Sequence, residues 1–248
     1  RAAARSPPPG HGVRSGAYPD RMCGRYASSR RPDDLTAYFE VEQAPEQVLP
    51  PSWNVAPTDP VYAVLERNQV RQLRVLRWGL VPSWAKDPKV GARFINARQE
   101  TVADKPAFRS AYARRRCLLP ADGYYEWKVE PGGKQPYYLS LPGGEPLAMA
   151  GLYEVWHGPD DQRLWTCTVL TTSAPDELGE IHDRTPMLVP RQAWGTWLDP
   201  ELGDPGDLLI AGRPGLLSAW PVGAEVGNVR NNGASLATPR GCGRSAGG

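Results

Sequence analysis

Four short segments of the sequence place polar or reactive side chains among glycine and aromatic residues. They are residues 22–26 (MCGRY), 94–98 (FINAR), 121–127 (ADGYYEW) and 181–187 (IHDRTPM). Their candidate groups are the thiol, amide, carboxylate and imidazole of Cys23, Asn96, Glu126 and His182. Each is a weak signal alone, because a lone cysteine is usually a small core residue and a glutamate after two tyrosines usually faces outward. As a set they offer a nucleophile with acid–base partners, which is what covalent catalysis needs.

The elements that must position these groups are mostly short strands. Patterns of branched and aromatic residues predict strands at 61–66, 70–78, 137–141, 147–156, 164–171 and 216–222. Shorter amphipathic patterns predict helices at 32–41, 106–115, 191–198 and 207–211. Strands and helices do not alternate regularly, which disfavours a doubly wound parallel sheet. We therefore expect one α+β domain of mostly antiparallel strands with short peripheral helices.

Composition excludes several classes of protein. Of the 248 residues, 40% are hydrophobic and 23% are charged, so the chain has the composition of a globular protein. No stretch approaches the roughly 18 apolar residues of a membrane helix, and no export signal is visible. The four cysteines are far apart and form no Cys-x-x-Cys pair, so neither a zinc site nor a disulfide framework is expected. These features predict an intracellular protein with no membrane partner and no metal.

Charge gives little guidance to a partner, because the formal net charge is only +2. Residues 1–21 and 240–248 carry the excess of arginine, which leaves the body of the chain slightly acidic. Nucleic-acid binding would therefore need a local basic surface. Two arginine runs, within 67–77 and 109–116, could supply one, although solvated edges of a strand and a helix explain them equally well.

Four further stretches accompany the first four, in a fixed order from Cys23 to about Asn232. They are residues 53–57 (WNVAP), 78–84 (WGLVPSW), 150–153 (AGLY) and 226–231 (VGNVRN). This ordered set resembles the SOS-response-associated peptidase (SRAP) family, the abasic-site-crosslinking proteins of bacteria and eukaryotes. The resemblance implies a single SRAP-type domain over 23–238, with a curved, barrel-like, mainly antiparallel sheet and short peripheral helices. Residues 1–22 would be a disordered extension or a leader from a misassigned start, and 239–248 a disordered tail.

The resemblance also implies a function, which is recognition of an abasic site in single-stranded DNA and covalent linkage to it. In such proteins the initiator Met is removed and leaves an N-terminal cysteine. The α-amine has a pKa of about 8, so part of it is an unprotonated nucleophile near neutral pH. It would attack the aldehyde of the ring-opened sugar to give an imine, and the thiol of Cys23 would close a five-membered thiazolidine ring. The crosslink would shield the lesion during the response to DNA damage.

Roles for the other catalytic residues follow from the matching positions. His182 would be the general acid and base, because imidazole titrates nearest to neutral pH among the side chains. Glu126 would transfer protons at the linkage and assist its reversal, and Asn96 would hydrogen-bond the sugar or orient the amine. An imine also permits β-elimination, so abasic-site lyase activity accompanies this prediction. No cofactor is implied.

Four more residues are predicted to contact DNA. Arg25 and Arg98 would bind phosphates, because a guanidinium matches phosphate geometry. Trp84 and Trp127 would stack or wedge beside the lesion, with core packing an equal alternative for each. The partner would be single-stranded DNA containing abasic sites, bound by a monomer. The protein would be cytoplasmic, and nucleoid-associated when bound to DNA.

One feature of the sequence departs from the family pattern. Cys23 follows Arg21 and Met22, so it has no free amine as written and could not form a thiazolidine. We expect either that translation starts at Met22, which is then trimmed, or that the chain is cleaved between Met22 and Cys23. The second route would be autocatalytic peptidase chemistry of the Cys23 thiol with His182.

Two other classes of function fit the same residues. A Cys–His thiol peptidase acting on proteins would use Cys23 as nucleophile, His182 as base and Asn96 as orienting group, but it leaves Glu126 without a task. A non-catalytic single-stranded DNA-binding module would use only the aromatic residues and arginines, and it leaves Cys23 and His182 unexplained.

Overall fold

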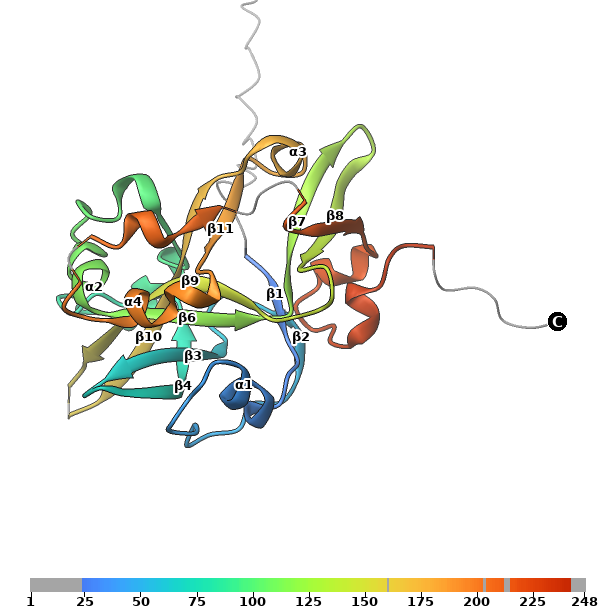
Figure 1. The fold of residues 1–248 in the computed structure, drawn as a ribbon. Coiled ribbons are helices and arrows are strands. Elements are labelled where there is room, and N and C mark those ends of the chain that lie inside the picture. The colour runs from blue at the N-terminus through green and yellow to red at the C-terminus, as the bar shows by residue number, and fades with distance from the viewer. Residues whose placement is uncertain (1–23, 160, 203, 212–214, 242–248) are drawn as a thin grey trace, which may run out of the picture.

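Two β-sheets packed face to face form the body of the molecule, and short helices cover its outside (Figure 1). The structure is a computed structural model that describes residues 24–159, 161–202, 204–211 and 215–241. The first sheet has five strands in the order β13-β8-β7-β1-β2, and we call it the small sheet. The second has eight strands in the order β12-β11-β9-β6-β3-β4-β10-β5, and we call it the large sheet.

The small sheet brings together strands from both ends of the described chain. Its strands are β1 (Tyr26–Ser28), β2 (Ser52–Val55), β7 (Gly123–Glu130), β8 (Gly133–Ser140) and β13 (Ser218–Pro221). All of their pairings are antiparallel. β7 and β8 form a long hairpin, and its neighbour β1 places the N-terminal end of the described chain beside that hairpin.

The large sheet is curved enough to close on itself. Its strands are β3 (Pro60–Arg67), β4 (Val70–Trp78), β5 (Asn96–Arg98), β6 (Arg116–Ala121), β9 (Leu147–His157), β10 (Arg163–Ser173), β11 (Arg184–Leu188) and β12 (Ile210–Ala211). Because β10 pairs with both β4 and β9, the strands β9, β6, β3, β4 and β10 form a closed circuit. Among the named strands that the structure describes, β10 pairs in parallel with β4 and with β5, and the other pairings of this sheet are antiparallel. The predicted barrel-like, mainly antiparallel α+β fold is therefore confirmed.

The helices are short. The α-helices are α1 (Pro32–Tyr38), α2 (Arg109–Arg114), α3 (Asp176–Gly179) and α4 (Trp194–Leu198). The 3-10 turns are η1 (Pro88–Arg93), η2 (Gln99–Thr101), η3 (Arg191–Ala193), η4 (Gly206–Leu208), η5 (Ala224–Gly227) and η6 (Ala234–Ala237). Figure 1 shows α2 and α4 on the side of the molecule away from the β7–β8 hairpin, and α3 near that hairpin. Within the described residues, no helix is long and apolar enough to cross a membrane.

Alternating side chains divide the core into three clusters. Tyr26 and Tyr124 of the small sheet pack with Trp78 and Met149 of the large sheet, and we call this the inter-sheet cluster. On the other face of the large sheet, helical residues such as Leu35 of α1 belong to a second cluster, which we call the helix-facing cluster. The outer face of the small sheet packs against η5 and η6. Strands such as β6, β9 and β11 are thus buried on both faces, which explains why strict alternation of polar and apolar residues is rare in their sequences.

Most predicted strands are found close to their expected places, but one helix prediction is wrong. Residues 207–211 form a 3-10 turn followed by β12, which pairs with the edge of β11. Leu209 packs into the helix-facing cluster whereas Ile210 packs against the inter-sheet cluster. Adjacent apolar side chains that face opposite ways follow the period of a strand, not of a helix. The predicted domain limits at 1–22 and 239–248 lie largely outside the described residues, so they stay a prediction.

Candidate functional site

A cavity of about 620 Å³ opens at one end of the inter-sheet contact, where several predicted site residues meet. It is lined by Gly24, Arg25, Pro57, Glu126, Trp127, Val129, Lys134, Gly179, Glu180, Ile181, His182, Asp183 and Gly227. Cys23 itself lies outside the described residues. Its neighbour Gly24 lines the cavity, as do the predicted residues Arg25, Glu126, Trp127 and His182. The cavity therefore brings together residues of the sequence segments 22–26, 121–127 and 181–187.

Glu126 is held inside the molecule by the register of β7. Side chains two residues apart on a strand share a face, so Glu126 lies on the same side as Tyr124, which belongs to the inter-sheet cluster. Only 3% of Glu126 is exposed, so the outward orientation usual for such a glutamate does not apply. A carboxylate buried at a cavity wall is a group suited to proton transfer.

The start of β1 is fixed directly beside Glu126. The backbone N–H of Tyr125 donates a 3.0 Å hydrogen bond to the carbonyl of Arg25. The next pairs in register are Tyr26 with Tyr124 and Ala27 with Gly123. This ladder aims the chain that precedes Tyr26 at the cavity.

His182 reaches the cavity from the loop between α3 and β11. Its Nδ1 accepts a 3.2 Å hydrogen bond from the backbone N–H of Arg184. That bond assigns the proton of the neutral imidazole to Nε2. Nδ1 also lies 3.1 Å from Oδ1 of Asp183, which can accept a hydrogen bond when the ring gains its second proton. Both protonation states of His182 therefore have a partner, as a proton-transfer group requires.

Asn96 and Arg98 lie on β5, an edge strand of the large sheet. β5 pairs in parallel with β10, which matches Asn96 with Val169 and Arg98 with Thr171. They are not among the residues that line the cavity. β10 also pairs with β11, which follows His182, so one strand is the common neighbour of the segments carrying Asn96 and His182.

An ion pair ties these two segments together beyond the strand pairing. Arg184 Nη1 lies 2.6 Å from Glu100 Oε1, and Arg184 Nη2 lies 3.0 Å from Glu100 Oε2. Arg184 Nη2 also donates to the carbonyl of Thr171 at 2.8 Å. The hydrogen bond from Arg184 lowers the pKa of Glu100 to about 2, so the pair stays charged well into the acid range.

The two predicted stacking tryptophans have different surroundings. Trp127 lines the cavity and packs its partly buried ring against the cluster on the outer face of the small sheet. Trp84 is 62% exposed on the loop that follows β4. The backbone beneath Trp84 is anchored, because Trp156 Nε1 donates to the carbonyl of Ala85 at 2.7 Å. The ring of Trp84 is thus presented to solvent on a fixed support.

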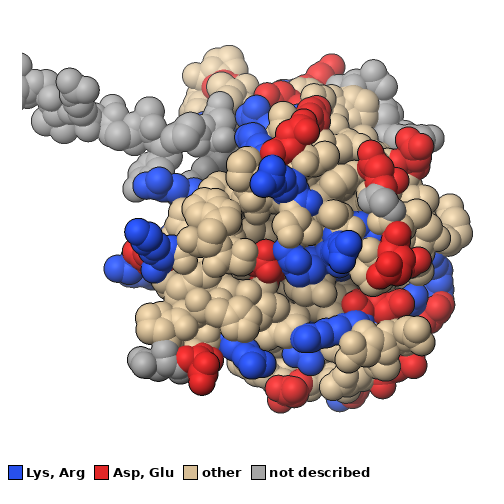
Figure 2. Space-filling model, turned by 90° about the vertical axis from the view of Figure 1, so that its left-hand side faces the viewer, with Lys and Arg blue, Asp and Glu red and all other residues tan. Residues whose placement is uncertain are grey.

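Charge around the site is mixed. The cavity wall includes the cations Arg25 and Lys134 and the carboxylates of Glu126, Glu180 and Asp183. Figure 2 shows a different face, the left-hand side of Figure 1 where α2 and α4 lie, and there too basic and acidic side chains are interspersed. Among the described residues, no group of three or more His, Cys, Asp or Glu side chains could hold a metal ion.

Sequence reasoning overlooked several residues around the site. It gave no role to Lys134 and Ile181 in the wall of the cavity, or to Glu100. Cys117 and Cys167 are buried, and burial raises the pKa of both thiols, so neither resembles an activated nucleophile. The stretch 53–57 carried the resemblance but no assigned chemistry, although Pro57 lines the cavity.

Comparisons with known proteins agree with this arrangement. The sequence profile of the family described as SOS response associated peptidase (SRAP) matches residues 22–229. The abasic site processing protein YoqW of Bacillus subtilis is 38% identical over 220 residues, which cover 87% of this chain and 98% of YoqW. The abasic site processing protein YedK of Escherichia coli is 32% identical over 228 residues, which cover 88% of this chain and 100% of YedK.

A solved structure supports the fold independently. The crystal structure of a protein from Bacteroides thetaiotaomicron superimposes with a TM-score of 0.79 at 22% sequence identity, covering 88% of this chain and 100% of that one. At that level of identity the likeness speaks for the fold alone. The profile match and the extent of the curated relatives settle the classification: this chain belongs to the SRAP family.

Proposed function

We propose that this protein processes abasic sites in single-stranded DNA by forming a thiazolidine crosslink through the amine and thiol of an N-terminal Cys23. The observation that carries the proposal is one cavity that brings buried Glu126 and His182 together with Gly24, the residue after Cys23. The relatives YoqW and YedK are named abasic site processing proteins, which supports the same substrate. The form proposed to act is a monomer.

The first bond forms between the α-amine of Cys23 and the aldehyde carbon of the ring-opened sugar. The amine loses a proton as the C–N bond forms, and Glu126, which lines the same cavity as Gly24, would accept it. The aldehyde oxygen takes up a proton from solvent, and the hydroxyl of the resulting carbinolamine then leaves as water with a proton from the imidazolium form of His182. The nitrogen of the iminium ion returns a proton to His182. The product is an imine.

The second bond closes the ring. The thiolate of Cys23 adds to the imine carbon, and the imine nitrogen takes up a proton. The overall reaction releases one molecule of water. Reversal needs the nitrogen and sulfur to be protonated again, so buried Glu126 and His182 serve both directions. Partition of the imine to β-elimination would give the lyase activity, as a side path of the same intermediate.

DNA contacts complete the proposal. Arg98 and Arg25 would bind phosphates on the two sides of the lesion, and Asn96 would orient the sugar. Trp127 at the cavity and exposed Trp84 would stack on neighbouring bases. Phosphate and stacking contacts do not read base edges, so we expect salt-sensitive binding with little preference for sequence.

Intact mass of protein mixed with single-stranded DNA holding one abasic site tests the proposal. The form that begins at Cys23 should give a heat-stable adduct whose mass is the sum of protein and DNA less one water. Cys23→Ala should give no such adduct, whereas Cys167→Ala, which changes a buried thiol, should still form it. Crosslinking by a chain that still carries residues 1–22 uncleaved would contradict the amine mechanism. An adduct that forms only after those residues are lost would support peptidase processing.

A further inference from the structure

Asn54 on β2 stands at the centre of a buried hydrogen-bond network close to the cavity. Only 4% of the residue is exposed. Its Nδ2 donates to the carbonyls of Val226, Asn228 and Asn231 at 3.3, 3.0 and 3.0 Å. We call residues 224–232, which supply these carbonyls, the C-terminal strap. The partners are more than 170 residues further along the chain, so the contact joins the two ends of the domain.

The remaining polar atom of Asn54 holds Arg25. Arg25 Nη1 donates to Oδ1 of Asn54 at 2.8 Å and to the carbonyl of Val226 at 2.8 Å. Arg25 Nη2 donates to the carbonyl of Gly227 at 3.4 Å. The amide therefore acts as an adapter, because it accepts from the guanidinium with its oxygen and donates to the strap with its nitrogen.

Arg25 is consequently fixed at both its side chain and its backbone. The backbone carbonyl of Arg25 is held by Tyr125 on β7 at 3.0 Å, and the side chain by Asn54 and the strap. β1 contains only three residues, so the ladder that aims the chain before Tyr26 at the cavity rests on few backbone pairs and constrains that chain weakly. Arg25 lies two positions after Cys23, and its side-chain anchor supplies the missing constraint.

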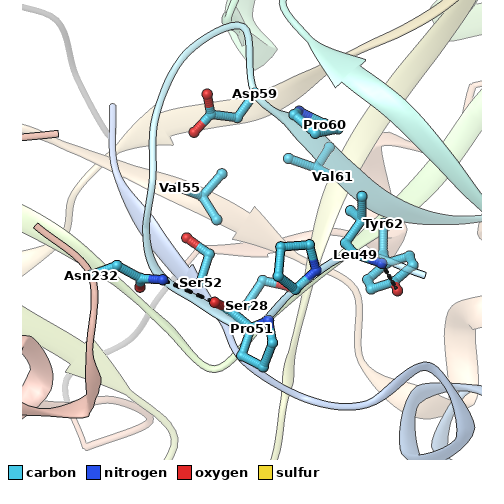
Figure 3. A pocket seen from close by; sticks show the side chains of 11 residues that line it. Ser28, Leu49, Pro51, Ser52, Val55, Asp59, Pro60, Val61, Tyr62 and Asn232 are labelled. Carbon is cyan, nitrogen blue, oxygen red and sulfur yellow. Dashed lines mark hydrogen bonds between the residues drawn. The ribbon is translucent and has the colours of Figure 1, made fainter. Parts of the chain in front are cut away.

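The strap has a second attachment that does not involve Arg25. Asn232 Oδ1 accepts from the backbone N–H of Trp53 at 2.8 Å, and Asn232 Nδ2 donates to the carbonyl of Pro51 at 3.0 Å. Figure 3 shows this second bond at the rim of a separate cavity of about 210 Å³, away from the carboxylate of Asp59. The strap can thus remain attached when the bonds of Asn54 are removed, which makes the two attachments separable by mutation.

We propose that Asn54 is a positioning residue for the chemistry at Cys23, because it locks the Arg25 side chain between β2 and the C-terminal strap. The inference rests on the proposed function and deepens it. Ring closure requires the amine and then the thiol of one residue to reach the same carbon, so it adds to imine formation the demand that the chain at the cavity turn the thiol toward that carbon. Loss of the lock leaves imine formation possible and slows closure of the thiazolidine.

The experiment separates the two bonds with borohydride. Protein beginning at Cys23 is mixed with abasic DNA for short times and quenched with or without borohydride, which reduces an imine to a stable amine and leaves thiazolidine unchanged. Asn54→Ala should close the ring about tenfold more slowly than wild type, with a larger share of adduct that needs borohydride to survive heating. Affinity for DNA carrying a tetrahydrofuran abasic analogue, which has no aldehyde, should change about threefold or less.

Asn232→Ala is the matched control, because it removes an asparagine of the same strap that does not touch Arg25. It should lower the melting temperature by a similar amount while keeping the wild-type ratio of imine to thiazolidine. Arg25→Lys provides a second break of the lock that keeps the positive charge, and it applies even if Asn54→Ala does not fold. Combined with Asn54→Ala it should add little further slowing, since both changes remove the same contact.

The results of these experiments distinguish failure of the inference about Asn54 from failure of the proposed function. A wild-type ratio in both Asn54→Ala and Arg25→Lys would overturn the inference while leaving the proposed function intact. Equal slowing in Asn232→Ala would also overturn it, by showing that general loosening of the strap is enough. If wild-type protein gave no adduct at all, with or without borohydride, the proposed function and this inference would both fail.

Discussion

The two walls of the cavity are held in place by different kinds of interaction. On the large sheet, the segment of His182 is fixed by strand pairing to β10 and by the ion pair of Arg184 with Glu100. On the small sheet, the segment that leads to Cys23 is fixed by a three-residue strand and by the neutral amide of Asn54. The anchor of the His182 segment therefore includes a titratable ion pair, whereas the anchor of Arg25 is the amide of Asn54, which does not titrate.

This difference shows how a candidate site can be divided between two sheets. Gly24 and Glu126 lie on the small-sheet side of the cavity and His182 lies just before β11 of the large sheet, so the proposed chemistry would depend on the fit between the sheets. One direct polar link across that contact is the 3.1 Å hydrogen bond between the hydroxyls of Tyr124 and Thr185. Substitutions in the two walls should therefore have different effects on stability, DNA binding and pH dependence, and these effects should show which wall has been changed.

The largest effect is expected from Gly123→Ala, which breaks the small-sheet wall. A Cβ at Gly123 would lie 2.4 Å from Cζ of Tyr138 and 2.5 Å from the carbonyl oxygen of Leu139. The second contact is with backbone of the paired strand, so neither β7 nor β8 can yield without losing register. We expect a loss of about 3 kcal/mol and a fall in Tm of about 10 °C by calorimetry.

Gly132→Ala at the tip of the same hairpin is the control for this prediction. A Cβ there meets nothing within 4 Å, so its effect on the free energy of unfolding should stay within about 0.5 kcal/mol. Equal melting temperatures for the two variants would show that the close approach at Gly123 does not constrain the small sheet.

The second prediction separates a packing role from a binding role for the two tryptophans. Trp84→Ala should weaken binding to single-stranded DNA about tenfold without changing Tm, because the ring is 62% exposed. Trp127→Ala should lower the free energy of unfolding by about 2 kcal/mol, because its ring packs against the outer cluster of the small sheet. Fluorescence anisotropy and thermal melts on both variants check this. Unchanged affinity in Trp84→Ala would remove that residue from the proposed DNA contacts.

Much of this arrangement could be predicted from the sequence, but the parts that hold the walls together could not. The strand predicted at 70–78 is β4, because its branched residues and the tight turn before it give local signals. The ordered motifs placed Glu126 and His182 in one site, and the structure brings both to one cavity. In contrast, Glu100 and Arg184 are 84 residues apart, and neither belongs to a spacing pattern that would link them.

The missed asparagine illustrates the same limit more strongly. Asn54 was visible within the stretch 53–57, yet an asparagine in sequence shows only that a donor and an acceptor are present. Its partners are three backbone carbonyls, which every residue possesses, so no side chain in the strap marks the contact. The helix predicted at 207–211 failed for a related reason, because its outcome depended on the free edge of β11 rather than on local propensity.

The smallest predicted effect is the pH dependence of the large-sheet wall. Hydrogen bonding from Arg184 lowers the pKa of Glu100 to about 2 in the folded protein, whereas an unfolded glutamate titrates near 4.3. A lowered folded pKa stabilises the protein above the unfolded value, and this contribution is lost as the pH falls from about 5 toward 2. Because Glu100 is 45% exposed, solvent screens the pair and we expect only about 1 kcal/mol at pH 7.

Chemical denaturation of Glu100→Gln between pH 7 and pH 2 tests this and sharpens the contrast between the walls. The difference in unfolding free energy from wild type should be full at pH 7 and should shrink as the pH falls toward the folded pKa of about 2, below which both proteins carry a neutral side chain. Glu130→Gln, at the exposed end of β7, should differ little from wild type at any pH. Asn54→Ala should lose the same amount at every pH, because its amide does not titrate. A deficit in Glu100→Gln that stays constant with pH would mean that the ion pair is not what holds the His182 segment to β10.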